Sequence, residues 1–459
     1  MLGRQVASIG IGVVGLIALT RLIGLVQYGY YAGFLAVVTV LTEIAALGVK
    51  VYLVRLSPDT GVDPFRGSFA FLLLSGTLTV GLAALVVVLL GDQLVPIEQR
   101  PAFLTMLLAI IFTLLGVPSF GLLERDLNFR AVAVVEFFND VFFYVVALPL
   151  AALGFGLWAP AIGYVLAQGS FFVRATVASG LRPSFVWSPA LARDLLRFGV
   201  PFSGAQLGVY GQRLVNPLVI GPLLGPAAVG IVALTIRAAD VLTFVSQVTS
   251  RLSIAVFSRI RVETGSLTAA HEEATMLQML AAGAPLAAFA VTAPWITPAI
   301  LGASWAPVSD VFPLVGLAYF TTASFNMSVS VLYVLGRNAL VASTQLLNLG
   351  ILAVATAVAA PRLGETGYAV GAAIGLLAYA YLAWRMRGVL EIRYRRLSPA
   401  FVAWSLAIVA VLLPRPAGLL LALAPLLLLL DSRQRQRLRE YLGYLRPLLA
   451  RRPASGARH

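Results

Sequence analysis

The sequence predicts an all-α polytopic membrane protein with about 14 transmembrane helices. Hydrophobic residues make up 60% of the 459 residues and charged residues only 11%, whereas a soluble domain carries roughly a quarter charged residues. Apolar runs of about 18 residues or more recur along the chain, and each is long enough to cross a bilayer as a helix. The basic residues, nearly all arginine, fall mostly between these runs.

The predicted spans follow one another closely, and Gly or Pro marks many of the junctions. Their limits are 5–25, 31–53, 68–90, 102–123, 132–153, 157–178, 199–223, 228–250, 279–301, 309–334, 338–360, 366–384, 399–413 and 416–430. The last two runs are the shortest. A cleavable signal peptide is not expected, because the first run lacks a small-residue cleavage site and another span follows it directly.

The distribution of arginine predicts the orientation. An even number of spans puts both ends on one side, and cytoplasmic connections carry the excess of Lys and Arg. With both ends cytoplasmic, 27 of the 33 basic residues lie on the inner side, and the outer side holds only Arg21, Arg100, Arg362 and Arg415. We therefore predict that the N- and C-termini are both cytoplasmic.

Two predicted cytoplasmic stretches have the pattern of interfacial helices. The stretch "SPALARDLLRF" (188–198) offers Ser188 as the N-cap and proline at the first helical position. The tail stretch "RQRQRLREYLGYLRPLLARR" (433–452) spaces Leu and Tyr helically among arginines. Such helices lie along an anionic membrane surface, and a basic anchor without a regulatory role is the simpler interpretation.

Several function classes are disfavoured by composition. The chain has 0 cysteines, and of its two histidines His271 falls in a predicted polar loop and His459 at the end, so we expect no metal site and no cofactor. No glycine-rich phosphate loop ending in Lys exists, because Lys50 is the only lysine and follows Val49. The net charge of +14 is dispersed between spans, so nucleic acid is not an expected partner.

An internal repeat divides the chain. Gly24 and Gly29 of "LIGLVQYG" match Gly225 and Gly230 of "LLGPAAVG", each where a predicted outward span turns into an inward one. A second echo pairs "LGFGLWA" (153–159) with "LGETGYA" (363–369), although Leu and Gly are common here and chance is the alternative.

Two such echoes predict two six-helix bundles that run the same way, as in transporters with parallel repeats. The predicted parts are an N-terminal bundle at 1–185 and a C-terminal bundle with an amphipathic lead-in at 186–390. Two additional transmembrane helices follow at 391–430, and a basic cytoplasmic tail at 431–459.

Four stretches, in order, carry a family resemblance. They are "RLIGLVQYGYYAGFLAVVTVLTEIAALGVKVYLVR" (21–55), "LLERDLNFRAVAVVEFFND" (122–140), "LLRFGVPFSG" (195–204) and "GPLLGPAAVGIVALTIRAADVL" (221–242). The chain resembles the polysaccharide/O-antigen flippase branch of the multidrug/oligosaccharidyl-lipid/polysaccharide exporter superfamily, over about residues 1–390. It departs from the family at "GLVQYG", where a Gly-Pro-Glu-like turn is more frequent, and at Val232, where tyrosine is common.

The resemblance implies a transporter, not an enzyme. Its substrate would be an oligosaccharide linked to a polyprenyl (pyro)phosphate, moved from the inner to the outer leaflet for surface polysaccharide or lipopolysaccharide O-antigen synthesis. The implied partners are that lipid-linked oligosaccharide, membrane lipids, and the glycosyltransferases and polymerase of the same pathway.

Ionisable residues inside spans are costly, so each is a functional candidate. Arg213 and Arg237 each lie 12 residues from Gly225, which is roughly 18 Å along a helix at 1.5 Å per residue and places both near mid-membrane. Two guanidinium groups at one depth suit a diphosphate. Arg21 and Lys50 extend this cationic path or simply reach an interface, and Arg237 has the alternative of pairing with Asp240 on its own helix.

Two carboxylates and two neighbours complete the predicted site. Glu43 and Asp240 lie near the middle of corresponding spans of the repeat, and buried carboxylates are what coupling to protons or sodium requires. The alternative is a hydrogen bond between helices. Tyr210 and Gln212, beside Arg213, are candidates for contacts to the sugar.

Other functions remain open. A drug/cation antiporter of the same fold would need an acidic cavity, whereas the intramembrane charge here leans basic. A membrane polysaccharide polymerase or glycosyltransferase would need acid/base residues in a sizeable outer loop, and the longest predicted one is "GDQLVPIEQRPAF" (91–103). A scaffold of this fold without transport activity is the fourth alternative.

Overall fold

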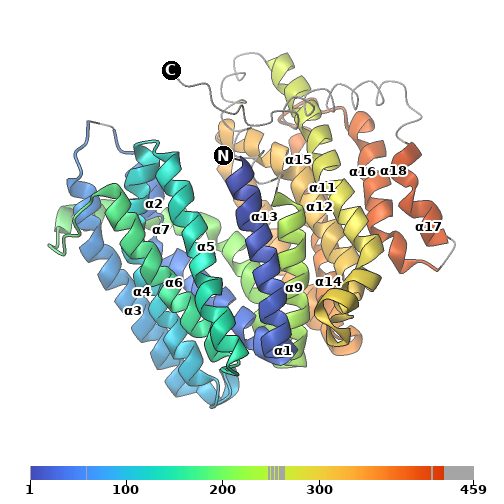
Figure 1. Ribbon diagram of the computed structural model, residues 1–459. Helices are drawn as coiled ribbons and strands as arrows, with labels where there is room; N and C mark the ends of the chain where they lie inside the picture. The colour runs from blue at the N-terminus through green and yellow to red at the C-terminus, as the bar shows by residue number, and fades with distance from the viewer. Residues whose placement is uncertain are drawn as a thin grey trace, which may run out of the picture. The chain divides into compact units, whose positions relative to one another are not determined.

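The computed structural model describes residues 2–57, 59–244, 246, 249, 253, 257, 264–414 and 417–427. Every regular element in these residues is a helix, which confirms the predicted fold class (Figure 1). The chain forms two compact units. The first comprises Met1–Val241, Pro294–Val311 and Arg337–Leu382, and the second Leu242–Ala293, Phe312–Gly336 and Ala383–His459.

Most of the described helices overlap a predicted span. Up to the first gap they are α1 Leu2–Ala46, α2 Val49–Val54, α3 Asp63–Leu94, α4 Arg100–Arg125, α5 Phe129–Ala152, α6 Trp158–Ser179, α7 Pro189–Val215, α8 Gly221–Leu224 and α9 Pro226–Leu242. Later come α11 Thr264–Leu301, α12 Val308–Val334, α13 Asn338–Leu363, α14 Thr366–Gly375, α15 Leu377–Met386, α16 Tyr394–Val409, α17 Ala417–Ala422 and α18 Ala424–Leu427. A π-helix, Asn216–Ile220, joins α7 to α8.

Ten helical stretches of the described residues are long and apolar enough to cross a membrane. The total of 14 spans and the orientation stay predictions. The fourteenth predicted span is described only over α17 and α18, and the tail stretch at 433–452 lies outside the described residues.

In the first unit, α3 and α4 differ in how much of their side-chain surface is exposed. One face of α3 leaves large leucine side chains exposed at helical spacing, at Leu78, Leu82, Leu85 and Leu89, as expected where lipid covers a helix. By contrast, α4 is mostly buried and packs against α3 and α6. The glycines of α4 permit this contact, because a side chain at Gly116 would run into the ring of Phe171.

The predicted interfacial helix and the seventh span are one helix. The Ser188 hydroxyl accepts a hydrogen bond from the Leu191 amide at 3.4 Å, as predicted for an N-cap. From there α7 runs without a break to Val215. Pro217 lies in the π-helix that follows, where the missing proline N–H no longer disturbs an α-helical ladder.

The prediction that His271 lies in a polar loop is wrong. His271 is in the third turn of α11, and only 1% of it is exposed. The predicted ninth span began at 279, but α11 begins at Thr264. A polar helix buried against protein lacks the apolar run that identifies a span, so hydropathy alone misplaces its start.

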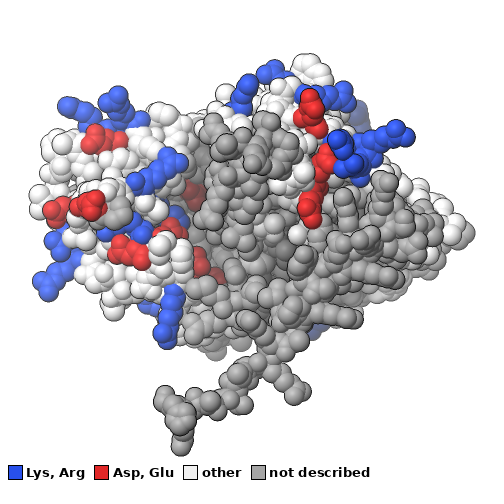
Figure 2. All heavy atoms as spheres, turned by 90° about the horizontal axis from the view of Figure 1, so that it is seen from above, with Lys and Arg blue, Asp and Glu red and all other residues white. Residues whose placement is uncertain are grey.

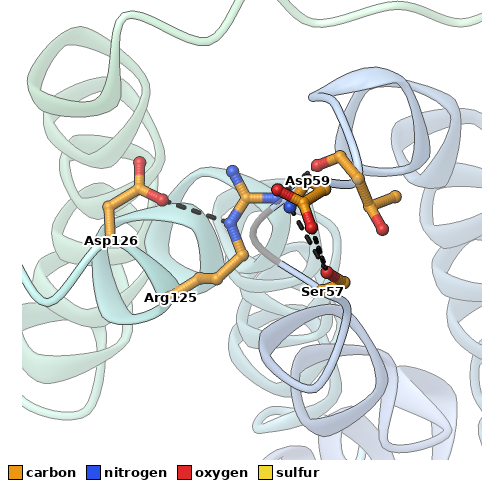
Figure 3. A network of polar contacts seen from close by, with 5 residues as sticks. Ser57, Asp59, Arg125 and Asp126 are labelled. Atoms are coloured by element: carbon orange, nitrogen blue, oxygen red, sulfur yellow. Dashed lines mark hydrogen bonds and ion pairs between the residues drawn. The ribbon is translucent and has the colours of Figure 1, made fainter.

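Figure 2 looks onto one end of the helices and shows charged side chains of both signs there. In the first unit, Arg125 closes this end against the loop after α2 (Figure 3). Its guanidinium bonds the Asp126 carboxylate at 3.1 Å and the Thr60 carbonyl at 2.9 Å, and it lies 4.6 Å from the centre of the Phe65 ring. In the loop itself, the Ser57 hydroxyl bonds the Asp59 carboxylate at 3.3 Å. Arg125 therefore holds the loop that leads into α3.

Candidate functional site

Two glycines turn the chain in the same way. Gly24, which breaks α1, has φ 76° and ψ 173°, and Gly225, between α8 and α9, has φ 83° and ψ 179°. Side chains rarely tolerate positive φ, so glycine is required at both. At the second echo, Gly154 and Gly364 also have positive φ, 85° and 61°. The first echo thus has matching backbone conformations at Gly24 and Gly225, and the second shares positive φ at Gly154 and Gly364.

The second glycines of the two motifs touch each other. A Cβ atom on Gly29 would run into the carbonyl oxygen of Pro226, and one on Gly230 would lie 2.9 Å from the carbonyl oxygen of Leu25. Pro226 precedes Gly230 by four residues, as Leu25 precedes Gly29. Each glycine therefore contacts the residue four positions before the other glycine, so the contact is reciprocal, as in a two-fold related pair. Near their turns, α1 and α9 therefore pack backbone to backbone.

Three predicted site residues meet between α1 and α7. The Tyr210 hydroxyl donates a hydrogen bond to Oε2 of Glu43 at 3.3 Å. Arg213, one turn further along α7, lies within electrostatic range of the same hydroxyl. Glu43 and Arg213 are exposed, and Tyr210 is half-buried. A cation, a carboxylate and a phenol are thus gathered on accessible surface of one unit, and we call them the Glu43 cluster.

Arg237 has a different set of neighbours. This arginine of α9 is exposed and lies within electrostatic range of the hydroxyl groups of Tyr28, Tyr31 and Tyr144. Tyr28 and Tyr31 are buried, and the Tyr144 hydroxyl donates to the carbonyl of Gly12 at 2.9 Å. We call these four side chains the Arg237 cluster. An arginine with phenol groups around it offers an anion both charge and hydrogen-bond donors.

The three tyrosines of the Arg237 cluster were missed in the sequence. For Tyr28 and Tyr31 the signal available was "YGYY" at 28–31, a run of phenols at the predicted turn between the first two spans. Tyrosine is frequent in membrane proteins, and its usual place is at the interface. Only the fold shows that Tyr28 and Tyr31 approach an arginine from a different helix.

The second predicted carboxylate also faces a phenol. Asp240 of α9 is half-buried and lies within electrostatic range of the buried Tyr368 on α14. Glu43 and Asp240 are therefore each next to a tyrosine of another helix. This arrangement fits both a coupling role and a hydrogen bond between helices.

Lys50 and Arg21 have partners of their own. The Lys50 ammonium lies 3.2 Å from Oε1 of Glu124 and 5.3 Å from the centre of the Phe120 ring. Since both partners are partly exposed, such a pair contributes at most about 1 kcal/mol. The Arg21 guanidinium donates to the Ala299 carbonyl at 2.9 Å. To take part in the predicted cationic path, Lys50 and Arg21 would have to break or share these contacts.

Gln212 joins two helices. Its amide nitrogen donates to the side-chain oxygen of Gln345 on α13 at 3.0 Å. Nearby on α13, the Asn348 amide donates to the Gly375 carbonyl of α14 at 2.9 Å. A contact from Gln212 to a sugar would have to replace or share the bond to Gln345.

Among the described residues, no group of three or more His, Asp or Glu side chains is arranged to hold a metal ion. The Glu43 and Arg237 clusters are built from arginine, carboxylate and phenol groups.

This fold and these groups define a class of protein: a polytopic, helical membrane protein with charged residues placed within its helices. The model of one family matches residues 18–310 of the chain. The chain belongs to the polysaccharide biosynthesis protein family.

One curated relative is the succinoglycan biosynthesis transport protein ExoT of Rhizobium meliloti (strain 1021). It is 28% identical over 238 residues, which is 49% of this chain and 46% of that protein. The chain therefore matches slightly less than half the length of this relative.

Solved structures share the fold. The lipid II flippase MurJ in an inward closed conformation matches with a TM-score of 0.69 at 12% identity, over 92% of this chain and 95% of that one. An inward-facing multidrug resistance MATE transporter matches with a TM-score of 0.58 at 16% identity, over 82% and 94%. These findings confirm the resemblance to the polysaccharide flippase branch of the exporter superfamily.

Proposed function

We propose that this protein flips an oligosaccharide linked to a polyprenyl (pyro)phosphate from the inner to the outer leaflet. The lipid-linked oligosaccharide would serve surface polysaccharide synthesis in a prokaryotic inner membrane, together with glycosyltransferases and a polymerase of the same pathway. Transport would proceed by alternating access around a cationic central cavity.

One observation supports this proposal above the others: the first unit carries two exposed arginines, each within electrostatic range of at least one tyrosine hydroxyl. Arg213 belongs to the Glu43 cluster, and Arg237 to the Arg237 cluster. Guanidinium groups bind phosphate oxygens in a bidentate manner, and phenols donate further hydrogen bonds. Glu43 and Asp240 are the proposed sites for a coupling proton or sodium ion.

The test replaces the two arginines in a strain that depends on this protein for its surface polysaccharide. Arg213→Ala should abolish the surface polymer and accumulate the lipid-linked precursor on the cytoplasmic side, while the protein remains in the membrane. Arg237→Ala should act in the same direction. Normal export by the double Arg213→Ala/Arg237→Ala variant would refute the pyrophosphate site.

Two control variants make the result specific. Arg362→Ala removes an exposed arginine at the end of α13 that belongs to neither cluster, so export should be unchanged. Arg213→Lys keeps the charge but loses the planar fork, and it should recover part of the export only.

The drug/cation antiporter alternative makes the opposite prediction. A cation would be held by the exposed carboxylate of Glu43, so Glu43→Gln would eliminate binding of the drug and Arg213→Ala would leave it intact. Binding of the lipid-linked oligosaccharide that fails in Arg213→Ala but persists in Glu43→Gln would favour the flippase.

A further inference from the structure

One face of α11 in the second unit carries buried polar side chains. His271, Thr275 and Gln278 are spaced four and three residues apart, so they lie above one another on the helix. Their exposed fractions are 1%, 3% and 1%. A face of this kind is unusual in a helix that is otherwise apolar enough to span a membrane.

These side chains leave polar atoms without a hydrogen-bond partner. The unpaired atoms are Nδ1 of His271, Oγ1 of Thr275, and both Oε1 and Nε2 of Gln278. Elsewhere on α11, the Thr292 hydroxyl donates to the carbonyl of Ala288 at 2.8 Å, but the Thr275 hydroxyl makes no such bond. Buried polar groups in proteins are nearly always paired, so these four atoms need a partner.

The facing helix is polar at the same levels. Ser328 of α12 lies 3.0 Å from Nε2 of His271. α11 and α12 meet at His271 and Ser328 and again at Phe289 and Phe312, so they run antiparallel. From this register we infer that Ser324 and Thr321 lie at the levels of Thr275 and Gln278. Both are buried, and both donate their hydroxyl protons to their own helix. Their oxygen lone pairs remain available as acceptors. We call these six side chains the α11–α12 seam.

The seam has one polar end and one apolar end. Next to His271, the Glu272 carboxylate accepts bonds from the Arg393 amide at 2.9 Å and from the half-exposed Arg396 guanidinium at 3.5 Å. In the other direction, the same face of α11 continues with Ala282 and Leu286, both fully buried. One turn beyond them, the rings of Phe289 and Phe312 lie 4.5 Å apart.

We propose that the α11–α12 seam is a water-filled pocket that opens at the Glu272 end and is closed by the Phe289–Phe312 ring pair. The seam mixes donors and acceptors and carries no carboxylate of its own, while the adjacent Glu272 is already bound by arginine. Water, with two donors and two acceptors, satisfies such a set, and buried water molecules typically bond to otherwise unpaired groups of this kind. A cation would lack an anionic ligand here.

The absence of cysteine from the chain permits a direct test. Thr275→Cys places a thiol in the seam, and Ala282→Cys places one two turns further along the same face, beyond the polar segment. Both positions are almost fully buried. With the full-length protein in membranes, a small water-soluble methanethiosulfonate should modify Cys at 275 at least about tenfold faster than at 282, because the reaction requires access to the thiol.

Equally slow modification of the two variants would show a dry, packed interface and overturn the proposal. Equally fast modification would overturn the closed apolar end. If Thr275→Cys does not fold, hydroxyl-radical footprinting of the unmodified protein replaces it. Oxidation of His271 with protection of Phe312 supports a hydrated seam, whereas protection of both, or oxidation of both, contradicts it.

Discussion

At Glu43, the fold places a carboxylate against a phenol from another helix, at 3.3 Å from the Tyr210 hydroxyl. A hydrogen bond to a charged group contributes about 1.5–3 kcal/mol when buried, but Tyr210 is only half-buried and Glu43 is exposed. Water therefore competes for both groups. The bond positions the carboxylate more than it stabilises the protein.

Replacing Tyr210 and Glu43 separately should distinguish positioning of the carboxylate from coupling of transport to an ion gradient. Tyr210→Phe keeps the ring and removes only the hydroxyl, so transport should fall by less than about tenfold, equivalent to about 1.4 kcal/mol. Glu43→Gln removes the charge that a coupling ion would bind, and should abolish the dependence of transport on an imposed proton or sodium gradient. Transport of the lipid-linked substrate into the outer leaflet of proteoliposomes measures both.

Glu98→Gln is the matched control, because this exposed carboxylate lies in the connection between α3 and α4. It should leave the gradient dependence unchanged. If Glu43→Gln retained the gradient dependence of the unmodified protein, Glu43 would have to be removed from the coupling site.

The sequence allowed the charged members of the site to be predicted but not their neighbours. Arg213 and Arg237 stand out because charge within an apolar run is rare and costly. Tyr28 and Tyr144 do not stand out, and their approach to Arg237 depends on how α1, α5 and α9 pack. Lys50 was predicted to extend a cationic path or to reach an interface, and its partner Glu124 lies on a helix distant in sequence.

Among the elements, α1 shows what glycine spacing encodes. Gly24 is needed for its backbone conformation, and an added Cβ would meet nothing within 4 Å there. Gly29 is needed for space, because the carbonyl oxygen of Pro226 occupies the position of a Cβ. The two glycines of one motif are thus required for different physical reasons. The spacing in the sequence alone does not distinguish these reasons.

This difference predicts opposite effects of alanine at two positions of α1. Gly29→Ala should destabilise the protein by roughly 1–3 kcal/mol, because backbone atoms must move to admit the methyl group. Gly33→Ala should be neutral or stabilising by up to about 1 kcal/mol, since its Cβ would meet only Pro217 and Val229 side chains at 3.6 Å and alanine favours the helix.

Thermal unfolding of the purified variants in detergent, followed by tryptophan fluorescence, compares the two directly. Gly230→Ala, on the other side of the reciprocal contact, should behave like Gly29→Ala. Equal unfolding temperatures for Gly29→Ala and Gly33→Ala would show that α1 and α9 do not pack closely near their turns.

For the whole molecule, apolar runs were sufficient to predict nearly every helix. The helix limits predicted from these runs are wrong where a helix is polar and buried, as at the start of α11. Hydropathy indicates contact with lipid and not contact with protein. The matching conformations of Gly24 and Gly225 support the predicted repeat. The division into bundles at 185 and 390 remains a prediction, as does the orientation.

The orientation is testable because the chain has no cysteine. Gly61→Cys labels the exposed loop after α2, and Ile97→Cys labels the exposed connection between α3 and α4. Since α3 alone separates the two positions, they lie on opposite sides of the membrane if α3 spans it. With a cytoplasmic N-terminus, a membrane-impermeant maleimide should label intact cells at 97 and not at 61.

After the cells are permeabilised, both variants should react, which controls for a thiol that is present but shielded. The reverse pattern in intact cells would invert the molecule and place the Arg125 end of the first unit outside, against the excess of arginine there. Labelling at both positions before permeabilisation would mean that α3 does not cross the membrane. The first pattern alone puts the arginine-rich end on the side where the proposed anionic lipid-linked substrate would be made.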